Sequence, residues 1–133
     1  MFVSRRRPVV FPQADHARFA GALALAWAER PPLPFDAFVR GVAEHDRGYG
    51  EHDNDPIGGV MGSERWVGIQ RRGFAPRGED AVVDLVVAMH VRRLLSSQED
   101  DHERAAYDEV DRLVASLLEQ ADVSRQDAET ADA

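Results

Sequence analysis

The chain of 133 residues contains no cysteine, and all 16 of its basic residues are arginine. Without cysteine it forms no disulfide and no thiolate metal site, so a bound metal would need imidazole and carboxylate ligands. This donor chemistry suits Mg, Mn, Fe or Zn, and a divalent metal is therefore the cofactor that the composition allows.

Long apolar segments are also lacking. No window approaches the roughly 18 uninterrupted apolar residues of a transmembrane helix. The segment SRRRPVVFPQ has three arginines and only a short apolar run, unlike the apolar core of a secretory signal. We therefore expect a cytoplasmic protein that has no membrane partner.

Positive charge is scarce. The formal net charge is −8, and acidic residues are concentrated toward the end of the chain. Binding to nucleic acid or to an anionic membrane requires exposed positive charge. The charge balance thus predicts no nucleic-acid partner and directs attention to small-molecule substrates.

Apolar residues recur at helical spacing in several segments, which predicts a mainly α fold, a compact bundle of four to five helices. The predicted helices span residues 13–29, 35–47, 79–97 and 100–121, and ERWVGIQRR forms a shorter one. A short N-terminal strand or hairpin precedes them, and a glycine-rich loop over residues 48–79 follows the second helix. One helical domain is expected over residues 1–121. Residues 122–133 lack an apolar stripe and are expected to be flexible.

The first predicted helix carries Phe19, Leu23 and Trp27 at steps of four residues. This spacing places the three side chains on one face, which we expect to be buried. His16 lies one turn before this face. It is therefore expected to point into the protein and away from solvent.

Three histidines and an aspartate are expected on the inner faces of three separate helices: His16, His45, Asp46 and His90. The doublet of His45 and Asp46 extends the apolar stripe of the second helix, at the start of the stretch VAEHDRGYGEHDNDP. Side chains on facing helices can hold a divalent ion that activates water. The alternative is that each histidine is a hydrogen-bonded residue of the core, and the pattern leaves both interpretations open.

Three further polar residues surround this motif in the sequence. Asp53 is a candidate metal ligand that would close the site from the loop side. His52, beside it, is more typical of a polar turn before Pro56. His102 lies within EDDHER and is expected to face solvent.

Tyr49, Arg71 and Arg72 are candidate substrate-binding residues, because they lie in the segment that follows the doublet. An arginine guanidinium is well suited to holding a phosphate or a carboxylate. The alternative interpretation of the two arginines is a surface pair.

The blocks FPQADHARFAGALALAW, VAEHDRGYGEHDNDP, WVGIQRRG and DLVVAMHVRRLL resemble, in this order, those of an uncharacterised bacterial family, domain of unknown function 3891. The resemblance covers about residues 9–120 and extends distantly to the HD-domain superfamily of helical metal-binding proteins. It implies an HD-like bundle in which His16 is the first histidine and His45 and Asp46 are the doublet. His90 would be an added ligand or a proton-transfer residue.

Two features depart from the family pattern. Tyr49 stands where the family usually has another aromatic residue. An HD site also normally takes its last ligand from a late helix, and the candidates here are only Asp53, Asp84 and Asp111. None of the three matches that position, so Asp53 or a partner chain completes the site, or metal binding is weakened.

The sequence and the resemblance together predict a metal-dependent hydrolase of the phosphohydrolase type, with Asp46 and His90 as catalytic residues. Two alternatives remain open: an HD-type iron oxygenase, and a non-catalytic helical module that acts through oligomerisation or a partner. Broad apolar faces, such as the one around Leu85, Val86 and Met89, further predict a homodimer.

Overall fold

Six α-helices make up most of the described residues, which are 2–3, 10–54 and 62–132 of this computed structural model. The elements are β1 (Phe2–Val3), β2 (Val10–Phe11), α1 (Gln13–Ala26), α2 (Phe35–Ala43), the 3-10 helix η1 (Gly50–Asn54), α3 (Ser63–Phe74), α4 (Ala81–Leu94), α5 (Asp101–Ala121) and α6 (Arg125–Asp132). β1 and β2 pair antiparallel. The mainly helical class is confirmed, but the number of helices is higher than the four to five predicted. Within the predicted glycine-rich loop, residues 55–61 lie outside the described residues.

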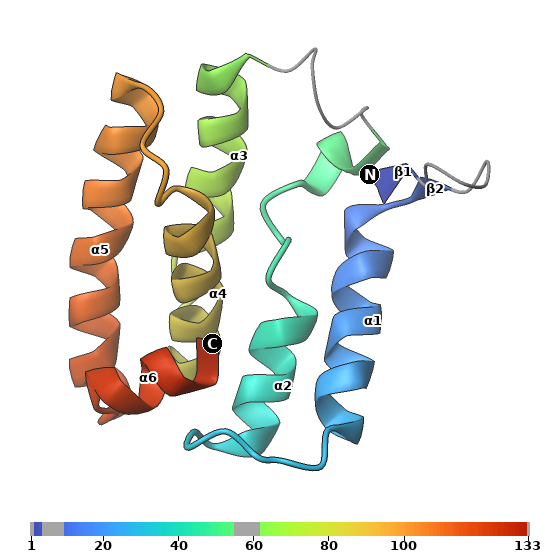
Figure 1. Ribbon diagram of the computed structural model, residues 1–133, viewed down its shortest axis with the longest axis vertical. Helices are drawn as coiled ribbons and strands as arrows, with labels where there is room; N and C mark the ends of the chain where they lie inside the picture. Colours follow the sequence, from blue (N-terminus) through green and yellow to red (C-terminus); the bar gives the residue numbers. More distant parts are fainter. Residues whose placement is uncertain (1, 4–9, 55–61, 133) are drawn as a thin grey trace.

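α4 lies at the centre of the bundle (Figure 1). α5 and α2 pack against it, α3 contacts both α4 and α5, and α6 crosses one end. A helix with apolar residues on most of its faces is stable only when other elements surround it, which is why α4 takes this position. α1 packs chiefly against α2, at the edge of the bundle.

The side of α1 that faces the protein is made of small residues, contrary to the prediction. Phe19, Leu23 and Trp27 are 63%, 48% and 66% exposed, whereas Gly21 is buried. A Cβ atom on Gly21 would lie 2.6 Å from the Cβ of Ala43 in α2. The two helices are too close for large side chains between them, so the bulky residues of α1 lie on its outer side.

α2 ends at Ala43, earlier than predicted, and residues 44–48 form turns. The N–H of His45 donates to the carbonyl of Val42, three residues back, instead of continuing the α-helical pattern. Such tightening is typical of a helix end. As a result, His45 and Asp46 lie on a turn beyond the helix and not on its last turn.

The tail is not the flexible segment that was predicted, because residues 125–132 form α6, which packs on α4. Ser124 caps this helix by accepting from a backbone N–H at 3.0 Å, and Ala128 is only 3% exposed. The residue that makes this contact is a small alanine, and the segment has no stripe of large apolar residues that would predict it. The guanidinium of Arg93 in α4 also donates to the carbonyl of Asp132 at 2.6 Å.

The surface that suggested a homodimer lies inside the bundle. Leu85 is fully buried and Met89 is 6% exposed, because α4 is covered on most sides. The large apolar residues that remain exposed lie mainly on α1. The homodimer stays a prediction, but its original basis was wrong.

Arg47, in the turn that carries the doublet, anchors this turn to the connection between α3 and α4. Its guanidinium donates to the carbonyls of Gly73 and Ala75, both at 2.9 Å, and to the carboxylate of Asp84 at 2.7 Å. The side chains of Arg47 and Asp84 are only 5% and 2% exposed. A buried charge needs such partners, because leaving it unpaired costs several kcal/mol.

Asp84 joins the same network from the first turn of α4. Its carboxylate accepts from the backbone N–H groups of Arg77 and Gly78, at 3.0 and 2.9 Å. Burial raises the pKa of Asp84, but the N–H of Gly78 and the guanidinium of Arg47 outweigh it and hold the pKa below its usual range. The carboxylate is therefore ionised at neutral pH and fixes the position of the turn.

We predict that Asp84→Asn lowers the free energy of unfolding by about 3 kcal/mol at pH 7, because it leaves the buried Arg47 with only the partly exposed carboxylate of Glu44, at 3.4 Å, as a counter-charge. Because the pKa of Asp84 is lowered in the folded protein, its stabilising effect is fully present above about pH 4. This effect is lost as the pH falls below that value and the carboxylate becomes protonated. Urea unfolding of both proteins at pH 7 and near pH 3 measures this difference. Asp111→Asn is the control, because Asp111 pairs with Arg92 at the surface and its loss should cost less than about 1 kcal/mol. Equal losses in the two variants would contradict the prediction.

Candidate metal centre

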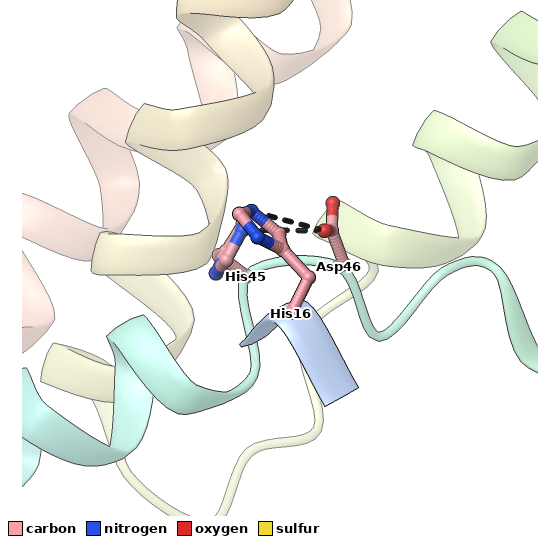
Figure 2. Close-up of side chains that lie close together, drawn as sticks. All are labelled: His16, His45 and Asp46. Atoms are coloured by element: carbon pink, nitrogen blue, oxygen red, sulfur yellow. Dashed lines mark ion pairs between the residues drawn. The ribbon is translucent and has the colours of Figure 1, made fainter. Parts of the chain in front are cut away.

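Four side chains from three parts of the chain meet beside α4. His16 comes from α1, His45 and Asp46 come from the turn after α2, and His90 comes from α4. Figure 2 shows His16 and His45 directed toward the carboxylate of Asp46. The structure thus brings the predicted residues together, and their role as metal ligands stays a prediction.

The carboxylate of Asp46 lies at the centre of the group. Its Oδ2 is 3.2 Å from Nε2 of His45 and 4.0 Å from Nε2 of His16, and its Oδ1 is 4.0 Å from Nε2 of His90. The ring of His45 is edge-on to both other rings, with centroid distances of 5.1 Å to His16 and 4.5 Å to His90. Among the described residues, His16, His45 and Asp46 each place a ligand atom within 4.8 Å of the others.

The other nitrogen of His45 determines how its ring is used. Nδ1 lies 2.7 Å from the carbonyl oxygen of Val42, which can only accept a hydrogen bond, so Nδ1 carries a proton. In the neutral ring Nε2 then has a lone pair that faces the carboxylate of Asp46. Two electron-rich atoms at 3.2 Å repel each other unless a proton or a cation lies between them.

The three imidazoles differ in pKa, and the carboxylate of Asp46 is the group that acts to raise the pKa of each. Burial lowers the pKa of His45, but its contacts with Asp46 and the carbonyl of Val42 outweigh burial and raise it. Burial lowers the pKa of His16 despite the attraction of Asp46. Burial and the neighbouring His45 lower the pKa of His90 to about 4. His90 is therefore neutral at pH 7 and has the protonation state that a ligand or a proton acceptor needs.

A cavity of about 320 Å³, which we call the inner cavity, opens beside the three imidazoles. Most of its walls are apolar, and α1, α2, α4 and α6 all contribute to them. Its size is at the lower end of the range for small-molecule sites. The histidines thus face a space in which a small ligand fits.

Asp53, predicted as a metal ligand from the loop, has a different partner. Its carboxylate accepts from the backbone N–H groups of Gln13 and Ala14, the first residues of α1. These N–H groups have no partner within the helix, and an aspartate oxygen satisfies them well. Asp53 therefore caps α1 and positions His16 one turn later, so the prediction of a direct ligand is not supported.

The predicted substrate-binding residues lie away from the inner cavity. Arg71 donates two hydrogen bonds of 2.8 Å to the carboxylate of Glu109, and these bonds raise the pKa of Arg71. Arg72 donates to the carbonyl of Gly48 at 3.4 Å. Tyr49 is 7% exposed and lines a separate recess together with Asp46. For the two arginines, the alternative of structural pairing agrees better with the contacts.

Arg93 is a lining residue that the sequence interpretation missed. It comes three residues after His90 on α4, lines the inner cavity and lies close enough to His45 and His90 to influence their pKa values. The spacing from His90 was visible in the sequence. The position of α6, which holds Arg93 through Asp132, was not.

The remaining polar candidates have ordinary partners. Asp84 binds Arg47 and Asp111 binds Arg92, so neither supplies the late HD-type ligand. The Nδ1 atom of His52 lies 3.0 Å from a guanidinium nitrogen of Arg65. His102 is exposed on α5, as predicted.

Gly48 allows the turn of the doublet to lie directly on α3. A Cβ atom at this position would be 2.3 Å from the carbonyl oxygen of Ile69 and 2.6 Å from the nitrogen of Gly73. Both are backbone atoms, which cannot rotate away as a side chain can. A side chain at residue 48 would therefore separate the turn, and Asp46 with it, from the bundle.

We predict that Gly48→Ala lowers the free energy of unfolding by about 3 kcal/mol, since overpacking of this kind typically costs 1–3 kcal/mol. Gly68→Ala is the matched control. Gly68 lies in α3, and no neighbouring atom lies within 4 Å of the Cβ that the substitution adds. A helical alanine is favoured over glycine, so this control should be stabilised by up to about 1 kcal/mol. Thermal and urea unfolding measure both, and a neutral Gly48→Ala would show that the turn does not need this close contact.

Among the described residues, no helix combines the length and the apolar character that crossing a bilayer demands. The resemblance to the bacterial family and to the HD superfamily stays a prediction at this point. The chain matches no family model, no curated protein and no solved structure.

Proposed function

We propose that this protein is a metal-dependent hydrolase of the HD type, which acts on a small molecule and holds a divalent ion with His16, His45 and Asp46. The observation that carries the proposal is the orientation of His45. Its Nδ1 is held by the carbonyl of Val42, and its Nε2 faces the carboxylate at 3.2 Å. Metal-bound histidines commonly donate their second nitrogen to a carbonyl in this way.

The donor atoms fit a metal ion in kind and in spacing. Imidazole nitrogens and carboxylate oxygens bound to one ion at about 2.0–2.2 Å lie roughly 3–4 Å from one another. The separations of 3.2 Å and 4.0 Å from Asp46 to the two histidines agree with this requirement after small side-chain movements. Two histidines and one carboxylate are fewer ligands than a closed structural site has, which leaves positions for water and substrate.

The residues around the ion have distinct tasks in this proposal. When bound, a divalent ion lowers the pKa of a coordinated water and polarises the bond to be hydrolysed. Asp46 holds the ion and orients the two imidazoles. His90 would accept the proton of the attacking water at Nε2 and return it to the leaving group, because its ring lines the inner cavity and this nitrogen lies on the side of Asp46, 4.0 Å from Oδ1. The resemblance to phosphohydrolases favours a phosphate ester as the substrate.

An iron oxygenase is the second candidate, and the donor set itself favours it. Two histidines and one carboxylate with open positions are the ligands of non-haem Fe(II) oxygenases. The two candidates share the ligands and differ in the metal and the reaction. Metal analysis of purified protein, followed by assays for phosphate release and for oxygen consumption, separates them.

We predict that the protein binds one Mn²⁺ ion and that His45→Ala weakens this binding by more than about 100-fold, because loss of even an outer partner of a metal ligand costs 10–100-fold. Isothermal titration calorimetry with Mn²⁺, Zn²⁺ and Mg²⁺ measures the affinities. His102→Ala is the matched control, because His102 is exposed on α5, apart from the site. It should bind the ion as the unchanged protein does.

Two results would count against the metal centre. The first is equal metal affinity in His45→Ala and in the control variant. The second is unchanged protein that binds no divalent ion, with a lowered melting temperature as the only effect of His45→Ala. The second result would favour the non-catalytic helical module.

A further inference from the structure

Two cavities adjoin the candidate metal centre and share part of their walls. The inner cavity has apolar walls formed by Leu33, Phe38, Val42, Leu85, Val86 and Met89. The second, the outer cavity, has a volume of about 520 Å³. Its lining residues include Leu23 of α1 and Trp27, the C-cap residue of that helix. Ala20, Phe38, Val42 and Ala131 line both. The two cavities therefore adjoin, and we call them together the apolar groove.

Polar groups are concentrated at one end of this groove. His16, His45 and His90 line the inner cavity together with Arg93 and Asp132. In the outer cavity the charged lining residues are Glu29 and Arg30, both of which are exposed in the connection between α1 and α2. A ligand that fills the whole groove would thus meet polar groups at its inner end and apolar side chains along most of its length.

The outer cavity also gives a reason for part of the exposed surface of α1. Leu23 is 48% exposed and Trp27 is 66% exposed, and both line this cavity. Contiguous exposed apolar side chains commonly mark a binding site. Phe19 and Leu25 are also exposed, but they are outside the residues that line the two cavities.

We propose that the apolar groove binds an amphiphilic small molecule with an alkyl chain. Its polar, reacting end lies at the three histidines, and its chain runs past Phe38 and Val42 toward Trp27. The assignment of the reacting end rests on the proposed function. The assignment of the chain rests on the shape and composition of the groove.

A small molecule fits this groove better than a second copy of the chain does. An α-helix with its side chains is about 10 Å across. The inner cavity is bordered by α1, α2, α4 and α6, and at about 320 Å³ it has no room for such an element. Because the outer cavity shares Ala20, Phe38, Val42 and Ala131 with this small cavity, one extended ligand would account for both, whereas a second copy would cover only the outer part.

The experiment uses methyl-, butyl- and octylphosphonate, which carry a phosphate-like head that is not hydrolysed. Binding is measured by calorimetry with and without Mn²⁺, and by the fluorescence of Trp27. Each buried methylene should tighten binding roughly threefold to fourfold, so octylphosphonate should bind far more tightly than butylphosphonate. The fluorescence shift should accompany the long chain, and Trp27→Phe should remove most of it.

Leu23→Asp and Leu25→Asp form a matched pair on the exposed surface of α1, where neither substitution disturbs the core. Leu23 lines the outer cavity and Leu25 is outside the lining of both cavities. Leu23→Asp should weaken octylphosphonate binding about tenfold, because a charge replaces apolar contact with the chain. Butylphosphonate binding should change less than about twofold, and Leu25→Asp should affect neither ligand.

The outcomes separate this inference from the proposed function. If the protein binds the metal tightly but its affinity for the phosphonates does not depend on their chain length, the proposal of an amphiphilic ligand is wrong and the metal centre remains supported. A chain-length dependence that persists without any metal binding would support the groove and count against the metal centre. If light scattering shows a dimer that Leu23→Asp dissociates, a second copy occupies the outer cavity and the amphiphile is wrong.

Discussion

The buried pair of Arg47 and Asp84 determines where the rest of the site lies. Arg47 follows the doublet directly, and its contacts attach the turn to the α3–α4 connection and to the first turn of α4. Removal of either charge would leave the other buried without its main charged partner, which is unfavourable in the interior. The turn therefore has one position relative to α4, and Asp46 faces His90 because of it.

Close packing of α1 on α2 supplies the other half of the site. Gly21 allows the two helices to approach until only small side chains fit between them. This approach brings His16 to 4.0 Å from Asp46, and the cap from Asp53 fixes the start of the helix. The same geometry places the large apolar residues of α1 on the outside, where Leu23 and Trp27 border the apolar groove. Formation of the histidine cluster and exposure of this surface thus have a common cause.

Electrostatics within the cluster follow from its composition. Three imidazoles share a single carboxylate, which can balance at most one imidazolium. Burial lowers the pKa values of His16 and His90, and the attraction of Asp46 does not offset it. His45 alone has a raised value, because both of its nitrogens face acceptors. The neutral imidazoles of His16 and His90 beside the carboxylate of Asp46 form an electron-rich pocket. Such a pocket suits a cation, and the apolar inner cavity beside it suits a small ligand with a polar end.

The sequence by itself determined the helical class, the approximate extent of α1, α2, α4 and α5, and the identity of the four residues that meet. Helical periodicity carries the class and the extents of the helices, because a residue three or four positions from an apolar neighbour shares its face. It does not explain the meeting of the four residues, since the apolar face assigned to His16 is exposed and His45 and Asp46 lie on a turn beyond α2. Only the tertiary structure decided which face of α1 is buried, what Asp53 and Arg71 bind, and that α6 packs beside Arg93. These outcomes depend on how closely two helices approach and on partners 30 to 40 residues away, such as Asp53 with Ala14 or Arg71 with Glu109. Local spacing contains no information about such distances.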